Sequence, residues 1–169
     1  QDAYKRGSEF YTLSLFGKAQ EEFERALSGR NLLFPAQNTS ELFFVKAELY
    51  AALSALKLEH PDAEKRLLTF IQKNEPGSEA SRAKLEVGNY YYAKREYDKA
   101  IQYLSKITWT ELGDMSNEEV LEAKFKLAYC YFVKKQFQSA APLFLQIKGS
   151  PSKYAESSIY YYGLCAFFQ

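Results

Sequence analysis

Few side chains in the sequence have the types and spacing that catalysis or metal binding requires. The chain contains one histidine, His60, and two cysteines, Cys130 and Cys165. Three such residues are too few for a four-ligand zinc site of Cys and His within the chain. A single histidine also excludes the His-Glu-x-x-His metalloprotease motif. The phosphate-binding patterns Gly-x4-Gly-Lys and Gly-x-Gly-x2-Gly do not occur either. The sequence therefore predicts a protein that is not an enzyme and holds no cofactor or metal.

The carboxylates are numerous, but their neighbours argue against acid–base chemistry. They stand beside lysine and arginine in stretches such as residues 21–25 (EEFER) and 63–67 (AEKRL). Opposite charges three or four residues apart are typical of the solvated face of a helix. A Ser-His-Asp arrangement would have to use His60, which stands next to Pro61 in a predicted turn. We expect the charged residues to cover helix surfaces.

Residues 60–62, His-Pro-Asp, are similar to the tripeptide that J-domain co-chaperones carry between two helices. Here the flanking segments fit a helical repeat, and Pro61 suits the first turn of a helix, where its missing N–H costs nothing. An interhelical turn is therefore the preferred interpretation. Co-chaperone activity that depends on His60 is an alternative.

Composition and charge exclude some classes of protein. The 169 residues suit one domain with a substantial core, and 22 basic and 21 acidic residues are interspersed along the chain. No basic stripe indicates a nucleic-acid interface, and no apolar run reaches the ~18 residues of a membrane-spanning helix. Aromatic residues are unusually frequent, with 14 Tyr and 13 Phe. Their spacing carries most of the information about the fold.

A spacing of small and aromatic residues recurs along the chain. Residues 88–104 follow the pattern Gly-x2-Tyr-x5-Tyr-x2-Ala-x3-Leu. Residues 7–23 fit the same template with Phe at the large positions, and residues 128–144 fit it with Ala first. A weaker copy begins at Ala51, and a further copy begins at Gly163. The first residues of successive copies lie 35 to 44 positions apart, which is the range of helical repeat proteins.

Each copy predicts two antiparallel amphipathic helices joined by a short turn, because apolar residues recur at i, i+3, i+4 and i+7 on both sides of it. Turn-forming residues separate the copies, and residues 116–119 (Ser-Asn-Glu-Glu) form a capping box that begins a helix. We expect one all-α solenoid, a right-handed α-α superhelix. Its repeats span about 1–30, 41–76, 79–110, 117–150 and 153–169, and the last lacks its second helix.

This pattern resembles the tetratricopeptide repeat, in which a small residue is followed by an aromatic residue three positions later and then by Tyr or Phe, Ala, and Phe or Leu. The resemblance covers nearly the whole chain. The sequence departs from the family by lacking its usual first Trp, by having Ser54 at an aromatic position, and by a long connection over residues 28–40. The resemblance implies stacked helix pairs whose first helices line a concave surface.

Residues at the concave positions of the family are the candidate partner-binding residues. We expect Tyr91 and Tyr97 to pack between helices, and aromatic residues on the concave side to face a partner or a later repeat. Exposed apolar surfaces usually mark protein-binding sites, and aromatic side chains bind with little loss of entropy. The candidate residues are Arg82, Leu85, Asn89, Tyr92, Phe125, Tyr129, Phe132 and Tyr160.

The two cysteines occupy the same position in successive copies, two residues after Ala128 and Gly163. Adjacent helix axes lie roughly 8–10 Å apart, whereas disulfide-bridged Cα atoms require less than about 7 Å. We therefore expect Cys130 and Cys165 to be buried free thiols, with a disulfide as the alternative.

Two stretches, residues 76–104 and 150–168, also resemble the repeats of bacterial periplasmic proteins. Examples are the lipoprotein that assists outer-membrane β-barrel assembly and the coordinator that works with the Tol-Pal complex. The resemblance implies a periplasmic location, with the cytoplasm as the alternative. A first residue other than Met fits removal of a signal peptide, and the incomplete last repeat predicts the N-terminal part of a longer protein.

The predicted function is that of a non-enzymatic scaffold that binds a protein or peptide partner in an aromatic-lined concave groove. The first alternative is a structural or oligomerisation array that spaces or associates other domains. The second is a docking module of a larger enzyme or signalling protein. The sequence leaves the oligomeric state open.

Overall fold

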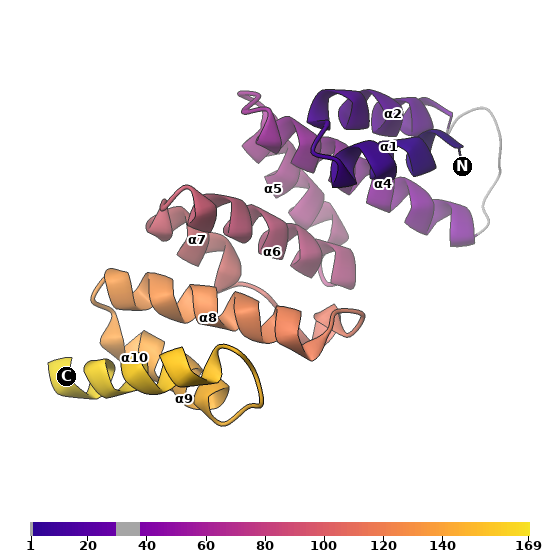
Figure 1. Ribbon diagram of the computed structural model, residues 1–169. Helices are drawn as coiled ribbons and strands as arrows, with labels where there is room; N and C mark the ends of the chain where they lie inside the picture. Colours follow the sequence, from indigo (N-terminus) through magenta and orange to yellow (C-terminus); the bar gives the residue numbers. More distant parts are fainter. Residues whose placement is uncertain (1, 30–37) are drawn as a thin grey trace. The chain divides into compact units, whose positions relative to one another are not determined.

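The computed structural model describes residues 2–29 and 38–169, and of residues 38–41 it describes the backbone alone. The regular elements of these residues are all helices. No strand occurs among these residues, so the predicted all-α fold of antiparallel helix pairs is confirmed. The elements are α1 (Asp2–Thr12), α2 (Phe16–Ser28), α4 (Asn38–Lys57), α5 (Ala63–Asn74), α6 (Ser78–Ala93), α7 (Tyr97–Leu104), the 3-10 helix η1 (Trp109–Leu112), α8 (Asn117–Val133), α9 (Phe137–Lys148) and α10 (Ala155–Phe168) (Figure 1).

The repeat ranges stay a prediction, and the helix bounds can be set beside them. The second repeat begins earlier than expected, at Asn38, and the predicted end of the first repeat at residue 30 lies outside the described residues. The predicted capping box begins α8: the backbone N–H of Glu119 donates to Ser116 Oγ (3.3 Å), and the Ser116 N–H donates to Glu119 Oε2 (2.8 Å). Two donors at the start of α8 thus have partners within the same turn.

One type of turn joins the helices of all four complete pairs, and the sequence did not predict it. The second residue after each first helix has a left-handed backbone with φ between 58° and 60°. The N–H of the next residue donates to the carbonyl five positions back, as from His60 to Ala55 (3.0 Å) and from Gln136 to Tyr131 (2.8 Å). This arrangement is the Schellman motif. It places His-Pro-Asp in an interhelical turn, as preferred from the sequence. The left-handed residues are Ser14, Glu59, Arg95 and Lys135.

The chain divides within α6 into two compact units, which we call the N-terminal unit (1–83) and the C-terminal unit (84–169). In the N-terminal unit, α2 packs against both α1 and α4 (Figure 1). Phe23 and Ala19 of α2 are fully buried there, together with Ala47 and Ala51 of α4. A core of this kind forms because small residues allow the helix axes to approach while one large ring fills the space between them.

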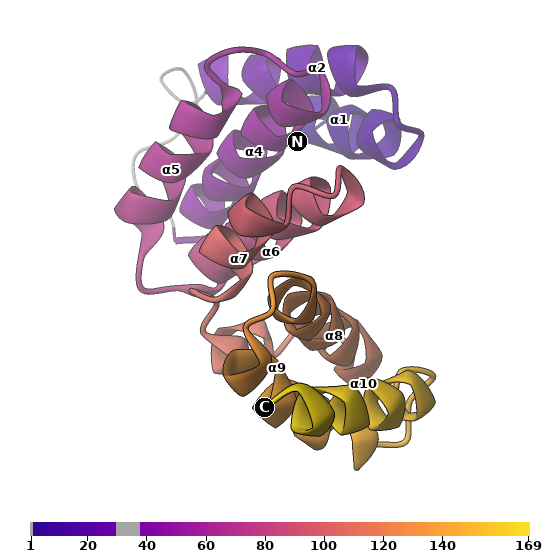
Figure 2. The same ribbon diagram turned by 90° about the vertical axis from the view of Figure 1, so that its left-hand side faces the viewer.

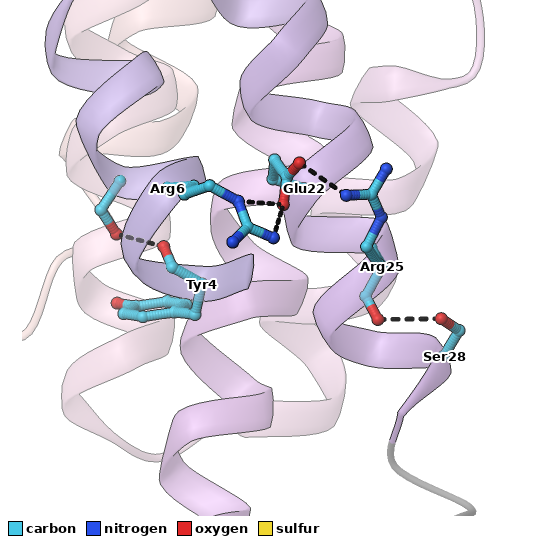
Figure 3. A network of polar contacts seen from close by, with 6 residues as sticks. Tyr4, Arg6, Glu22, Arg25 and Ser28 are labelled. Carbon is cyan, nitrogen blue, oxygen red and sulfur yellow. Dashed lines mark hydrogen bonds and ion pairs between the residues drawn. The ribbon is translucent and has the colours of Figure 1, made fainter. Parts of the chain in front are cut away.

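A buried carboxylate ties α1 to α2 in the N-terminal unit. Glu22 Oε2 accepts hydrogen bonds from Nε and Nη2 of Arg6 (3.1 and 2.9 Å), and Glu22 Oε1 accepts one from Arg25 Nη1 (2.8 Å). Figure 3 shows the two guanidinium groups on either side of Glu22. Both oxygens therefore have charged donors, which offsets the cost of burying the carboxylate.

In the C-terminal unit, α9 packs against both α8 and α10, as Figures 1 and 2 both show. The centre of this packing is Phe144 with Ala128, Ala140 and Cys165, all fully buried. Both cysteines are free and buried, so the predicted free thiols are confirmed. Burial raises the pKa of the Cys130 thiol to about 12 and also raises that of Cys165.

Candidate interaction surface of the C-terminal unit

An aromatic cluster spans four helices of the C-terminal unit. We call it the aromatic face and define it as Tyr92 (α6), Tyr97 (α7), Phe125, Tyr129 and Phe132 (α8), and Tyr161 (α10). The three residues of α8 are spaced by four and three positions, which places them on one side of that helix. All six side chains are half-buried.

Tyr161 of α10 contacts all three aromatic side chains of α8. Its ring centroid lies 5.0 Å from that of Phe132, 5.6 Å from that of Tyr129 and 6.2 Å from that of Phe125. It also stacks on Phe144 of α9 at 5.4 Å. These distances are typical of favourable aromatic pairs. The aromatic residues of α8 therefore face a later repeat, which was one of the two predicted possibilities. Contact with a partner as well stays a prediction.

The other end of the aromatic face is a triangle of tyrosines. The ring centroids of Tyr92, Tyr97 and Tyr129 lie 6.1 to 6.2 Å apart, edge to face. Burial, with a smaller contribution from the neighbouring tyrosines and Cys130, raises the pKa of Tyr92 to about 12. The phenol therefore remains neutral at physiological pH.

A polar group borders the tyrosines. Lys126 Nζ lies 2.8 Å from Glu122 Oε1, donates to Asn89 Oδ1 at 3.4 Å, and stands 5.7 Å from the ring centroid of Tyr92. The hydrogen bond from Lys126, followed by one from Tyr154, holds the pKa of the Glu122 carboxyl below its usual value. An apolar surface with a polar edge is the usual composition of a protein-binding site.

Two of the remaining predicted site residues, Leu85 and Arg82, are not members of the aromatic face. Leu85 is a correction, because it is only 2% exposed and belongs to the core. Its helix, α6, is buried on more than one side, since Ser81, Val87 and Gly88 are also buried, and this leaves Leu85 no outward face. Arg82 belongs to the N-terminal unit and is half-buried. Tyr91 is buried and stacks on Tyr103 at 6.0 Å, which confirms its predicted packing role.

Sequence reasoning did not assign Tyr161 to the site, although Tyr161 contacts three members of the aromatic face, as many as Tyr129 does. It stands in the run Tyr160–Tyr162, and the template gave preference to Tyr160. In the structure Tyr160 is 63% exposed, whereas Tyr161 faces α8. A one-residue shift on a helix rotates the side chain by about 100°, so small errors of register exchange inward and outward positions.

The most exposed apolar surface of the C-terminal unit lies on α10. Ile159 is 57% exposed, Tyr160 63% and Phe167 81%, and Gly163 and Ala166 between them are exposed too. We call these five residues the outer face of α10. Their spacing of three and four positions places them on one side of the helix, away from Tyr161 and Cys165. Contiguous exposed apolar residues of this kind usually mark an interaction surface.

Two further observations concern the part of the chain that the structure describes. No three His, Cys, Asp or Glu side chains in it gather as metal ligands would. None of its helices combines the length and apolar character needed to cross a bilayer.

Comparison with protein families gives a match to part of the chain. Residues 49–111 match the family model of the tetratricopeptide repeat. The matched region begins within α4 and continues through α5, α6 and α7 into η1. No curated protein matches the chain. The finding agrees with the resemblance found in the residue pattern, and it supports helix pairs of the tetratricopeptide type.

Proposed function

We propose that the protein is a protein-interaction scaffold that holds its partner on the C-terminal unit, with the outer face of α10 as the main contact surface. The single observation behind this proposal is the exposure of Ile159, Tyr160 and Phe167 on one helix. The similarity of residues 49–111 to tetratricopeptide repeats supports it, because helical repeats commonly present surfaces to protein partners.

The aromatic face is not the contact surface itself, but it packs α10 in place. Its rings hold α10 against α8 through Tyr161. Rigid support lowers the entropy cost of binding, since the partner does not have to order the surface. The proposed contact surface includes Tyr160, which the sequence also gave as a candidate partner-binding residue.

The test compares the proteins captured from the source organism by the chain and by two variants. The variant Tyr160→Ala/Phe167→Ala removes two exposed rings and should leave the fold intact. Leu145→Ala is the matched control, because Leu145 is 47% exposed on α9 of the same unit. We expect a partner that the control retains and the double variant loses. Capture of the same proteins by all three forms would contradict the proposal.

Self-association is a second candidate function, and the same exposed side chains favour it. A surface with Phe167 81% exposed can pair with a second copy as well as with another protein. Sedimentation velocity over a range of concentrations measures this directly. A dimer that Tyr160→Ala/Phe167→Ala converts to a monomer would favour an assembly role over a scaffold role.

The cellular location is a separate prediction. The resemblance to bacterial periplasmic repeats supports placement in the cell envelope, where the partner would then be sought. Fractionation of the source cells, with detection of the untagged protein, tests this. Recovery of the protein in the cytoplasmic fraction alone would contradict it.

A further inference from the structure

A cleft of about 650 Å³ opens on the N-terminal unit, lined by residues of α2, α4 and α5. The most buried residues of its lining are apolar: Phe70 is 1% exposed and Ala52 is 2% exposed, and half-buried Leu27 of α2 also lines it. We call these three residues the apolar floor. The volume lies within the range of about 300–1,000 Å³ that is typical of small-molecule sites. The cleft is therefore large enough for an apolar chain to lie on the floor.

Most of the polar lining comes from one side of α5. Lys65, Thr69 and Lys73 follow one another at intervals of four residues, and Arg66 stands three residues before Thr69, so their side chains share that side of the helix. At one end, Lys73 Nζ lies 3.1 Å from Oε2 of Glu48 on α4. This ion pair balances the two charges within the lining itself.

The other three polar residues of this row keep hydrogen-bond donors available. Half-buried Arg66 contacts Glu24 through Nη2 alone, at 3.4 Å, which is long for a hydrogen bond between charged groups. The same oxygen of Glu24 accepts a shorter bond from Gln20 Nε2, at 3.0 Å. Among the described residues, exposed Lys65 forms no ion pair and Thr69 Oγ1 forms no hydrogen bond. We call Lys65, Arg66 and Thr69 the α5 subsite.

The charge of the lining favours a ligand with one negative charge. Three cations and two carboxylates line the cleft. Because Lys73 pairs with Glu48, the charges that remain are those of Lys65 and Arg66 against Asp62. Asp62 stands just before α5, and its side chain makes no capping hydrogen bond. The remaining excess of one positive charge matches a carboxylate, whose two oxygens also fit the donors of a guanidinium group.

We propose that this cleft binds an amphipathic carboxylate, a small molecule in which a carboxylate is joined to an apolar chain. The carboxylate accepts hydrogen bonds from the α5 subsite, and the chain lies on the apolar floor. The inference goes beyond the proposed function, since the cleft belongs to the N-terminal unit and shares no residue with the outer face of α10.

The test uses octanoate as the probe, with the 169-residue chain observed by two-dimensional ¹H–¹⁵N NMR. Acetate supplies the head group alone, and octanamide is an uncharged analogue of the same length. Each methylene group buried on the floor should strengthen binding up to about fourfold, and loss of the charged hydrogen bonds should weaken it about tenfold or more. We therefore expect octanoate to bind at least about tenfold more tightly than either control.

Four protein variants locate the carboxylate. Arg66→Gln and Lys65→Gln each remove one cation of the α5 subsite, and the first should weaken octanoate binding about tenfold. Lys5→Gln is the matched control, because Lys5 is exposed on α1, lies outside the cleft and carries the same charge. Octanoate affinity should not change in this control. Asp62→Asn removes the opposing carboxylate and should strengthen binding by a few-fold.

The outcomes separate this inference from the proposed function. Equal affinity for octanoate and octanamide would overturn it, as would unchanged octanoate binding by both Arg66→Gln and Lys65→Gln. A capped peptide with Leu beside Glu that binds more tightly than octanoate would identify an acidic protein segment as the occupant, and would also overturn it. Tyr160→Ala/Phe167→Ala should bind octanoate as the wild type does, so the two proposals can fail independently.

Discussion

Alanine substitution at two equivalent glycines should have opposite effects on stability. Gly88→Ala introduces a methyl group 2.5 Å from Cγ of Leu104, and Leu104 is fully buried. Gly163→Ala introduces the same group where nothing lies within 4 Å. The two glycines are at the same repeat position and belong to the same C-terminal unit, so the comparison isolates packing.

The magnitudes follow from two opposing contributions. Replacing a helical glycine by alanine stabilises a helix by roughly 0.5–1 kcal/mol. Overpacking a closely packed core typically costs about 1–3 kcal/mol. Gly163→Ala should therefore raise the free energy of unfolding by roughly 0.5–1 kcal/mol. Gly88→Ala should lower it by about 1–2 kcal/mol, because the overpacking at Leu104 exceeds the helical gain.

Urea denaturation followed by circular dichroism measures both changes, and hydrogen exchange across residues 84–169 reports any local loosening. A double-mutant cycle with Leu104→Ala checks the cause: the methyl group of Gly88→Ala should be tolerated when Leu104 is shortened, with a favourable coupling of about 1 kcal/mol. If Gly88→Ala stabilised the protein as Gly163→Ala does, the close contact with Leu104 would not be a constraint on residue 88, and the reasoning would be refuted.

Three further predictions concern other parts of the fold. Tyr161→Ala should cost about 2–3 kcal/mol and release α10 first, since four rings pack on Tyr161; hydrogen exchange would show it, and unchanged protection of α10 would refute it. Lys135→Gly should stabilise by about 1 kcal/mol in thermal unfolding, because φ is 59° there, whereas Lys135→Ala should give no gain. Burial raises the pKa of the Cys130 thiol from an ordinary 9.0 to about 12. The stability that the buried neutral thiol contributes is therefore fully present below pH 9, and it is lost as the pH rises through 12. Urea midpoints between pH 8 and 12 should fall less steeply for Cys130→Ala than for the wild type; equal slopes would contradict this.

The fold was predictable because its information is local and repeated. Gly88 and Leu104, like Gly7 and Phe23, are separated by sixteen residues in the sequence and touch in the structure. A repeated spacing identifies such pairs without any knowledge of long-range contacts, since each helix pair is a unit of its own. The interhelical turns were harder to predict from the sequence. Arg95 and Lys135 adopt left-handed backbones that glycine or asparagine would have indicated, and neither of those residues is present.

The candidate site was only partly predictable. Tyr92, Phe125, Tyr129 and Phe132 do form one cluster, as their shared repeat positions indicated. Leu85 was wrongly placed on the surface because repeat positions do not report how many neighbours surround a given helix.

The sequence by itself determined the helix pairs and favoured free buried thiols, because each depends on residue type at a fixed spacing. Only the tertiary structure decided which aromatic side chains are covered. Tyr160 and Tyr161 are adjacent and chemically identical, yet one is exposed and the other packs on α8 and α9. The difference arises from the rotation of α10 against its neighbours, which is set by the packing of all three helices together.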